Sequence, residues 1–320
     1  MDPICHTLVG AALASTGLER KTRFGCATLI LGANLPDVDV ISYAWGEIAA
    51  FGCRRGITHG ILALIVLPFL LAGAMMLVGR LSRRKRGSAA AAVDFKWLLA
   101  LSVISIVSHP TLDFLNVYGV RWLMPFDDTW FYGDILYITD PWMWAILAVA
   151  LIAARWRRNL TAPRVLARPA CIGLLAAITY VIAMAAGASI SRRVVEASLG
   201  GAAIPRLMIA PVPFDPFQRA VVIDGKSAYR LGVVKLLPSP HFILDERRVP
   251  KGEGAAARLA AATDAGRIFL HWARFPLFEV DDSKTEPAVY IIDARYTLDR
   301  NAWFGAIRIP TSTAKTESKP

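Results

Sequence analysis

Long apolar runs separated by short basic clusters fill the chain up to residue 190. The runs 60–79, 97–118 and 170–190 are each long enough for a helix that crosses a bilayer, which takes about 20 residues. A shorter run, 141–154, leads into an arginine-rich segment and is interpreted as a fourth span. The pattern therefore predicts an α-helical membrane domain over 1–190 with about four full spans.

Two shorter apolar stretches, 7–18 and 24–36, come before these spans. Each is too short to cross a bilayer as an upright helix, because a full crossing takes about 20 residues. Basic residues lie between the two stretches, in the segment 19–23. We therefore predict a short N-terminal helical hairpin that is either re-entrant or tilted in the membrane.

After residue 190 the pattern changes to short runs of β-branched and aromatic residues separated by turn residues. This alternation predicts a small β-rich soluble domain over 191–310. The alanine-rich segment 252–266 is expected to form a helix within it, and the polar residues 311–320 are expected to form a disordered tail. Strands are expected within 218–237, 266–280, 287–298 and 303–310.

Charge distinguishes the two ends of the apolar segments. The chain has 36 lysine and arginine residues against 25 aspartate and glutamate residues, a net charge of +11. The basic residues gather in 20–23, 80–86 and 155–168, between apolar runs, which is typical of cytoplasmic loops rather than of a nucleic-acid-binding surface. The opposite segment ends and the β-rich domain are then extracytoplasmic. We therefore expect a multi-pass protein that contacts the lipid bilayer and binds no nucleic acid.

The cysteines and the N-terminus exclude two further classes of protein. The four cysteines lie in or beside apolar stretches without framework spacing, so neither a disulfide core nor a thiolate zinc site is indicated. The N-terminus has no basic region before its first apolar stretch, so a cleavable signal peptide is not expected.

Histidine and aspartate residues stand at the outer ends of the apolar segments. In the motif HPTLD, His109 and Asp113 are four residues apart and share one helix face. Pro110 removes a backbone hydrogen bond, and we expect the helix to kink or end there. Imidazole and carboxylate are ligands for zinc and other first-row divalent ions, so we predict a site for one to three ions, with zinc preferred. Its candidate ligands are His6, Asp37, Asp39, His59, His109 and Asp113.

Each of these motifs also has a structural explanation when it is taken alone. A single histidine near a helix end is commonly a hydrogen-bonded interfacial residue, and the aspartates of NLPDVD (34–39) are equally explained as a solvated helix stop. The combination is more informative, because ionisable groups at membrane depth are costly and indicate a functional site by default. His241 and His271, in the expected β-rich domain, are interpreted as surface or packing residues.

Three residues are candidates for a direct role in catalysis. One of the aspartates can act as a base instead of a ligand, and Asp37 is our choice. The adjacent Arg54 and Arg55 are candidates to hold a substrate phosphate, for which an arginine fork is suited. The alternative is that the two arginines form a loop charge pair or contact lipid headgroups.

Several segments resemble one known family. They are MDPICHTLVGAAL, LGANLPDVDV, RRGITHG, HPTLDFLNVYGVRWLMPF and FYGDILYITDPWMW, and they resemble the YdjM-type, LexA-regulated inner-membrane metal-dependent hydrolases. The resemblance covers about 1–190, while WARFP and DARY are similar to the additional C-terminal domain of a longer subgroup. It implies a bacterial inner-membrane location, a distant relation to zinc-dependent phospholipase C, and metal binding by the six candidate ligands.

The favoured hypothesis is a membrane-bound, metal-dependent hydrolase of phosphoester bonds, similar to phospholipase C, with a lipid or lipid-linked substrate. The candidate ligands lie at the bilayer edge, where a headgroup lies. One alternative is a divalent-cation transporter, which would place ligands deep within the spans. Another is a non-catalytic membrane scaffold in which a structural metal ties helices together.

The charge pattern makes a testable prediction about topology. We expect 80–96 and 155–169 to be cytoplasmic and residue 320 to be extracytoplasmic, because lysine and arginine bias the loops inward. A reporter that is active only in the cytoplasm, fused to the C-terminus, should therefore give no signal. A bright C-terminal fusion would overturn this arrangement.

Overall fold

The computed structural model describes residues 1–86, 93–158, 168–201, 204, 206–282 and 286–312. Contacts divide the chain into two compact units. The helical unit comprises Met1–Ile41, Arg55–Ala186 and Pro213–Pro216, and the β unit comprises Ser42–Arg54, Gly187–Val212 and Phe217–Pro320. The expected domain of 1–190 is therefore interrupted, because Ser42–Arg54 packs with the C-terminal part of the chain.

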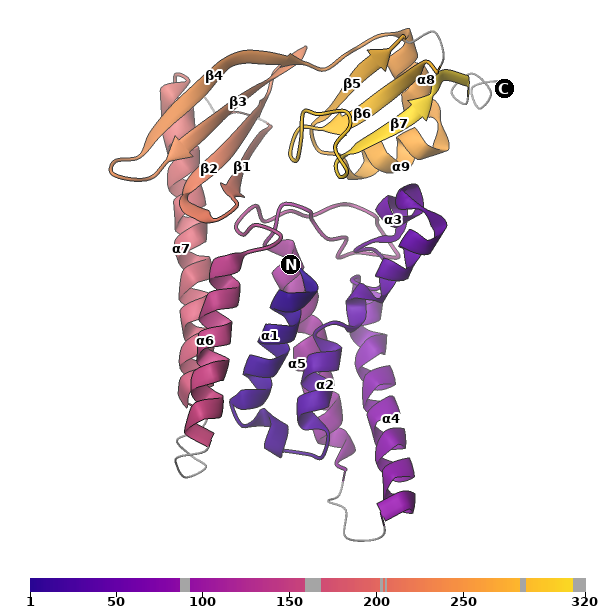
Figure 1. Cartoon of the computed structure of the whole chain (residues 1–320), viewed down its shortest axis with the longest axis vertical. Coiled ribbons are helices and arrows are strands. Elements are labelled where there is room, and N and C mark those ends of the chain that lie inside the picture. Colours follow the sequence, from indigo (N-terminus) through magenta and orange to yellow (C-terminus); the bar gives the residue numbers. More distant parts are fainter. Residues whose placement is uncertain (87–92, 159–167, 202–203, 205, 283–285, 313–320) are drawn as a thin grey trace. The chain divides into compact units, whose positions relative to one another are not determined.

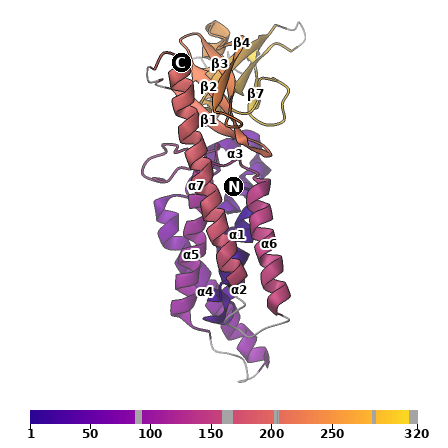
Figure 2. The same cartoon turned by 90° about the vertical axis from the view of Figure 1, so that its left-hand side faces the viewer.

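The helical unit is a bundle of helices and 3₁₀ segments (Figure 1). Its elements are α1 Pro3–Ser15, η1 Leu18–Arg20, α2 Gly25–Gly32, most of η2 Leu35–Trp45, α4 Ile61–Arg86, α5 Phe95–Phe114, α6 Pro141–Arg158 and the first part of α7 Arg168–Ser198. Seen from the side, α4 and α5 run along each other (Figure 2), and they pack together.

Three of the described helices are long and apolar enough to cross a membrane: α4 over Ile61–Ser82, α5 and α7. This agrees with three of the four expected spans. The fourth, α6, is a shorter apolar helix over Pro141–Trp156, so a fourth full span is not established. The expected N-terminal hairpin corresponds to α1 and α2, which pack against each other.

Aspartate caps fix where two of these helices begin. Asp2 accepts hydrogen bonds from the backbone nitrogens of Ile4 and Cys5, at 2.9 and 3.2 Å, and so caps α1. Asp94 caps α5 in the same way. We expected Pro110 to kink or end the helix, and it does not end it, since α5 continues to Phe114. Proline is tolerated in membrane helices where neighbouring groups satisfy the freed carbonyl. Because α5 continues past Pro110, Asp113 lies on its last turn.

Close backbone approach holds the hairpin in place. A Cβ atom at Gly10 would lie 2.7 Å from the carbonyl oxygen of Leu29, so only glycine allows α1 to lie this close to α2. A Cβ atom at Gly32 would lie 2.0 Å from Oγ of Ser105. The absence of a side chain at Gly32 therefore allows the end of α2 to lie directly against α5. These contacts place the backbone of Ala33, directly after α2, beside the last turns of α5.

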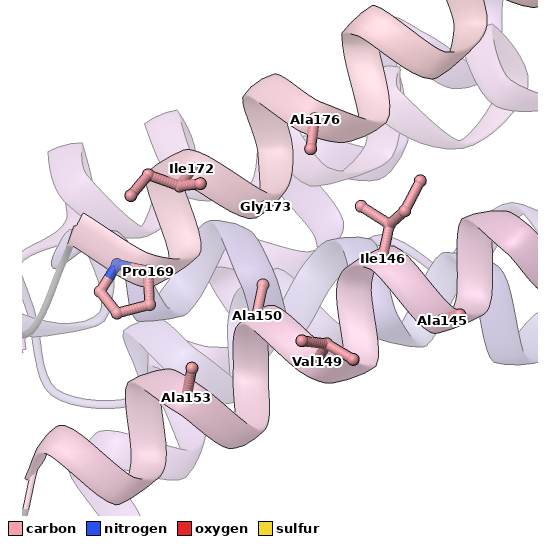
Figure 3. Close-up of a pocket in the computed structure, with 9 residues that line it drawn as sticks. All are labelled: Ala145, Ile146, Val149, Ala150, Ala153, Pro169, Ile172, Gly173 and Ala176. Carbon is pink, nitrogen blue, oxygen red and sulfur yellow. The ribbon is translucent and has the colours of Figure 1, made fainter.

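An apolar pocket of about 580 Å³ lies between α6 and α7 (Figure 3). The two helices lie close together where Gly173 faces Ala150, since a Cβ atom at Gly173 would lie 2.2 Å from that of Ala150. The residues around the pocket are Ala145, Ile146, Val149, Ala150, Ala153, Pro169, Ile172, Gly173 and Ala176. Small residues at helix–helix contacts are common in membrane bundles, where they permit close packing.

The β unit contains two antiparallel sheets. The first has the order β1-β2-β3-β4, and the second has the order β5-β6-β7. The strands are β1 Leu207–Val212, β2 Asp215–Asp224, β3 Ala228–Lys235, β4 His241–Pro250, β5 Pro276–Asp281, β6 Ala288–Asp293 and β7 Ala306–Pro310, and the helices are α3 Glu47–Cys53, α8 Ala255–Ala262 and α9 Asp264–Trp272. The expected β-rich character is confirmed.

One expected strand of the β unit begins as a helix. The segment 266–280 begins within α9, and only its last part forms β5. Thr263 caps α9 by accepting a hydrogen bond from the nitrogen of Gly266 at 3.0 Å. Gly266, Phe269 and Trp272 then recur every three residues on the buried face, which is a helical period and not a strand period.

Helix α3 contributes to the same core. The ring of Phe51 lies 5.1 Å from that of Phe269 and 4.7 Å from that of Trp272, measured between centroids. This contact explains why Ser42–Arg54 groups with the β unit. The expected cytoplasmic loops fall partly on 87–92 and 159–167, and most of the expected tail falls on 313–320, which lie outside the described residues.

Replacing Phe51 by alanine should destabilise the β unit. Phe51 is 4 % exposed, and truncating a buried phenylalanine costs about 3–5 kcal/mol. We expect a clear fall in the thermal unfolding midpoint of the full chain in detergent, followed by circular dichroism. The matched control is Trp303→Ala, because Trp303 is 91 % exposed and should contribute little. Equal midpoints for the two variants would contradict the packing described.

Candidate metal centre

Four side chains from three parts of the helical unit meet at one point. Asp37 comes from η2, His59 from the turn before α4, and His109 and Asp113 from the last turns of α5. One ligand atom from each residue lies within 4.8 Å of those of the other three. This group is the one set of three or more possible metal ligands found among the described residues, and it consists of residues expected from the sequence.

The imidazole nitrogens and carboxylate oxygens face one another at short range. Nε2 of His59 lies 3.1 Å from Nε2 of His109. Oδ2 of Asp113 lies 3.2 Å from the first of these nitrogens and 3.3 Å from the second. Oδ1 of Asp37 is 3.8 Å from each. His109 and Asp113 therefore use their spacing of one helical turn to serve the same point.

A backbone carbonyl fixes the ring of His109. Nδ1 of His109 lies 2.6 Å from the carbonyl oxygen of Ala33, which can only accept a hydrogen bond. Nδ1 must therefore carry the proton, and the lone pair of Nε2 points into the cluster. The close packing of α2 against α5 supplies this orientation.

Asp39 has the same effect on His59. Nδ1 of His59 is 3.3 Å from Oδ2 of Asp39 and 3.0 Å from Oγ1 of Thr58, which itself donates to Asp39 at 3.0 Å. The carboxylate lies behind the ring, on the side away from Nε2 of His109. Asp39 was expected as a ligand, but it lies outside the four-residue group and contacts the far nitrogen of one of its members.

The chemistry of these atoms fits a cation. Two nitrogen lone pairs held 3.1 Å apart repel each other unless a proton or a metal ion lies between them. Oδ2 of Asp113 accepts no hydrogen bond from any described residue, although it is buried. Two imidazoles and two carboxylates form a donor set that suits zinc and other first-row divalent ions. Asp37, His59, His109 and Asp113 are therefore the residues that would hold the ion.

His6 lies beside this group without belonging to it. Its ring stacks on that of His109, with centroids 3.7 Å apart and planes inclined by 18°. Its Nε2 lies 3.4 Å from Oδ1 of Asp113, and neither ring nitrogen hydrogen-bonds to any described residue. Of the six expected ligands, four thus meet directly, His6 contacts two of the four, and Asp39 contacts one of them.

Comparison with known proteins identifies the family of the chain. The model of the YdjM inner membrane protein family matches residues 1–193, which contain all six expected ligands. The chain belongs to this family. It is also similar to the uncharacterized protein YfhP of Bacillus subtilis (strain 168), at 23 % identity over 308 residues, covering 92 % of this chain and 87 % of YfhP. No solved structure matches the chain. The YdjM resemblance seen in the sequence is confirmed, whereas the relation to phospholipase C stays a prediction.

In this member of the YdjM family, the two candidate phosphate-binding arginines are placed differently. Arg54 follows α3 and lies over the ring of Tyr43, 5.9 Å from its centroid, within the β unit. Arg55 belongs to the helical unit and is only 3 % exposed. Its guanidinium lies 2.8 Å from Oδ1 of Asp113. Arg55 is therefore directly linked to the metal ligands.

Some residues around the centre carried no recognisable signal in the sequence. The carbonyl of Ala33 contributes through the backbone, which a sequence cannot show. Asn116 accepts a hydrogen bond from Arg55 at 2.9 Å, and its position three residues after Asp113 is the one available hint. The amino group of Met1 also contacts Oδ1 of Asp113. Ala33 thus orients His109, Asn116 holds Arg55, and Met1 contacts the carboxylate oxygen of Asp113 that faces away from the cluster.

The geometry predicts that single substitutions abolish metal binding. His109→Ala and Asp113→Ala should each weaken binding of zinc or cobalt by more than the roughly 10–100-fold that losing an outer partner costs. The double variant should be little worse than either single one, because both residues serve one point. Isothermal titration of the full-length protein measures this. His241→Ala and His271→Ala are the controls, and metal binding that survives His109→Ala would contradict the proposed ligand set.

Proposed function

We propose that this protein is a membrane-bound, metal-dependent hydrolase that cleaves phosphoester bonds in a lipid or lipid-linked substrate. The observation that carries the proposal is the meeting of Asp37, His59, His109 and Asp113 at the end of a candidate membrane span. Ionisable groups gathered at such a position are costly, so a functional role accounts best for them.

The surroundings of Asp37 support a lipid substrate. The same 3₁₀ segment presents apolar side chains outward, with Val38 and Val40 each 52 % exposed and Ile41 62 % exposed. Exposed apolar residues gathered beside polar groups are typical of surfaces that contact lipid or another apolar partner. A substrate with a phosphate headgroup and acyl chains matches both the charged cluster and its apolar border.

The residues divide the chemistry between them. A bound divalent ion lowers the pKa of a coordinated water and neutralises charge on phosphate oxygens. Asp37 is the most exposed member of the group, with 12 % of its side chain accessible against 0 % for the others, so it is the carboxylate that meets an incoming substrate. We assign Asp37 the role of accepting a proton from the attacking water or orienting it. A phosphate contact from Arg54 stays a prediction.

A structural metal is the second candidate function. Four protein ligands fill a tetrahedral site, and closed sites of this kind are typical of metals that stabilise a fold. The side chains of His59, His109 and Asp113 are fully buried, which also favours a closed site. A cation transporter is less favoured, because the described ligands gather at one end of α5 and not along its length.

Activity measurements separate these functions. We expect metal-loaded protein to release phosphate or phosphorylated headgroup from a panel of phospholipids and lipid-linked phosphates, and a chelator to stop the reaction. Asp37→Asn should lower kcat by about 10²–10⁴-fold, the usual contribution of a general base. His241→Ala is the control. Activity that survives both the chelator and His109→Ala would overturn the proposal, and bound metal without turnover on any substrate would favour the structural role.

A further inference from the structure

We propose that Arg55 is a positioning residue that turns Asp113 so that only one of its oxygens is offered to the metal. This inference rests on the proposed metal centre, though not on the identity of the substrate. It replaces the expectation that Arg55 holds a substrate phosphate.

The two oxygens of Asp113 have different surroundings. Oδ2 faces Nε2 of His59 and Nε2 of His109, at 3.2 and 3.3 Å. Oδ1 faces the guanidinium of Arg55 at 2.8 Å, and the amino group of Met1 and Nε2 of His6, at 3.4 Å, also lie against it. A carboxylate engaged by an arginine through one oxygen keeps the other in a fixed direction. Asp113 is therefore set up to bind an ion through Oδ2 alone.

The guanidinium of Arg55 is itself held on several sides. It donates to Oδ1 of Asn116 at 2.9 Å, to the carbonyl of Gly119 at 3.2 Å and to the carbonyl of Met1 at 3.3 Å. Its plane lies over the ring of Tyr118, 4.6 Å from the centroid. The guanidinium therefore already donates its hydrogen bonds to acceptors within the protein, which disfavours a role in binding a substrate phosphate.

The backbone of Arg55 also forms hydrogen bonds at this site. Arg55 has a positive φ of 50°, which is uncommon for a residue with a side chain and strains the backbone. Its nitrogen donates to Oδ2 of Asp39 at 2.7 Å, and its carbonyl accepts from the nitrogen of Arg121 at 3.0 Å. One residue thus contacts the aspartate behind His59 through its backbone and the ligand Asp113 through its side chain.

Charge and geometry act on the metal in opposite directions. The positive charge of Arg55 repels a cation, so removing it tightens binding, whereas losing the fork frees Asp113 to rotate and weakens binding. Arg55→Lys separates the two effects, because lysine keeps the charge but cannot reproduce the planar fork. Its effect on metal affinity therefore reports geometry.

The experiment is a titration of Co²⁺ into the metal-free full-length protein in detergent, followed by visible absorption. We expect Arg55→Lys to weaken Co²⁺ binding by about 10–100-fold, the usual effect of losing an outer partner of a ligand. The intensity of the Co²⁺ bands should also fall in Arg55→Lys and Arg55→Gln, because an Oδ1 held only by Met1 and His6 is held less firmly and can join the metal, which raises the coordination number. Asn116→Ala, which loosens the fork without removing it, should shift both readouts in the same direction by less.

The matched control is a variant that breaks a similar buried ion pair in the β unit. Arg295 and Asp293 form a buried pair in the β unit, 2.7 Å apart and with side chains fully buried. Arg295→Gln should lower the stability of the protein and leave the Co²⁺ affinity and spectrum unchanged. A folded Arg55→Lys variant with the Co²⁺ affinity and spectrum of the wild type would overturn the inference. A second outcome would also overturn it: Asn116→Ala binds Co²⁺ like the wild type, while Arg55→Lys raises the KM for substrate. Failure of the wild-type protein to bind Co²⁺ would instead overturn the metal centre.

Discussion

The structure of the site depends on one buried carboxylate. Asp113 lies on the last turn of an apolar helix, fully buried, where an uncompensated negative charge is very costly. Compensation comes from two sides, with Arg55 and the amino group of Met1 at Oδ1 and the imidazoles of His59 and His109 at Oδ2. The carbonyl of Ala33 and the carboxylate of Asp39 act one step further out, because they orient these two imidazoles.

Much of this site could be predicted from the sequence, for simple physical reasons. His109 and Asp113 share a helix face because of their spacing, and the distribution of lysine and arginine placed the other candidates at the same ends of the apolar segments. The division of roles was not predictable. Whether Asp39 contacts the ion or the ring behind it depends on side-chain direction, and the carbonyl of Ala33 depends on how closely two helices pack.

The fold shows the same limits. Long apolar helices and the β-rich character of the C-terminal region follow from periodicity and composition. The segment 266–280 was misassigned because aromatic and β-branched residues favour strands, whereas a threonine cap and burial every third residue make its first part a helix. Pro110 was expected to kink or end α5, and the helix continues past it, because a proline near the end of a packed helix removes only one hydrogen bond.

The hydrogen bond from the nitrogen of Arg55 to Asp39 has a consequence for how such proteins diversify. Asp39 precedes and Arg55 follows the excursion Ser42–Arg54, which packs with the β unit, so this bond closes the excursion at its base. This bond keeps Asp39 and Arg55 together independently of the length of the segment between them. Variation in Ser42–Arg54 can therefore be accommodated without moving the two residues that face His59 and Asp113.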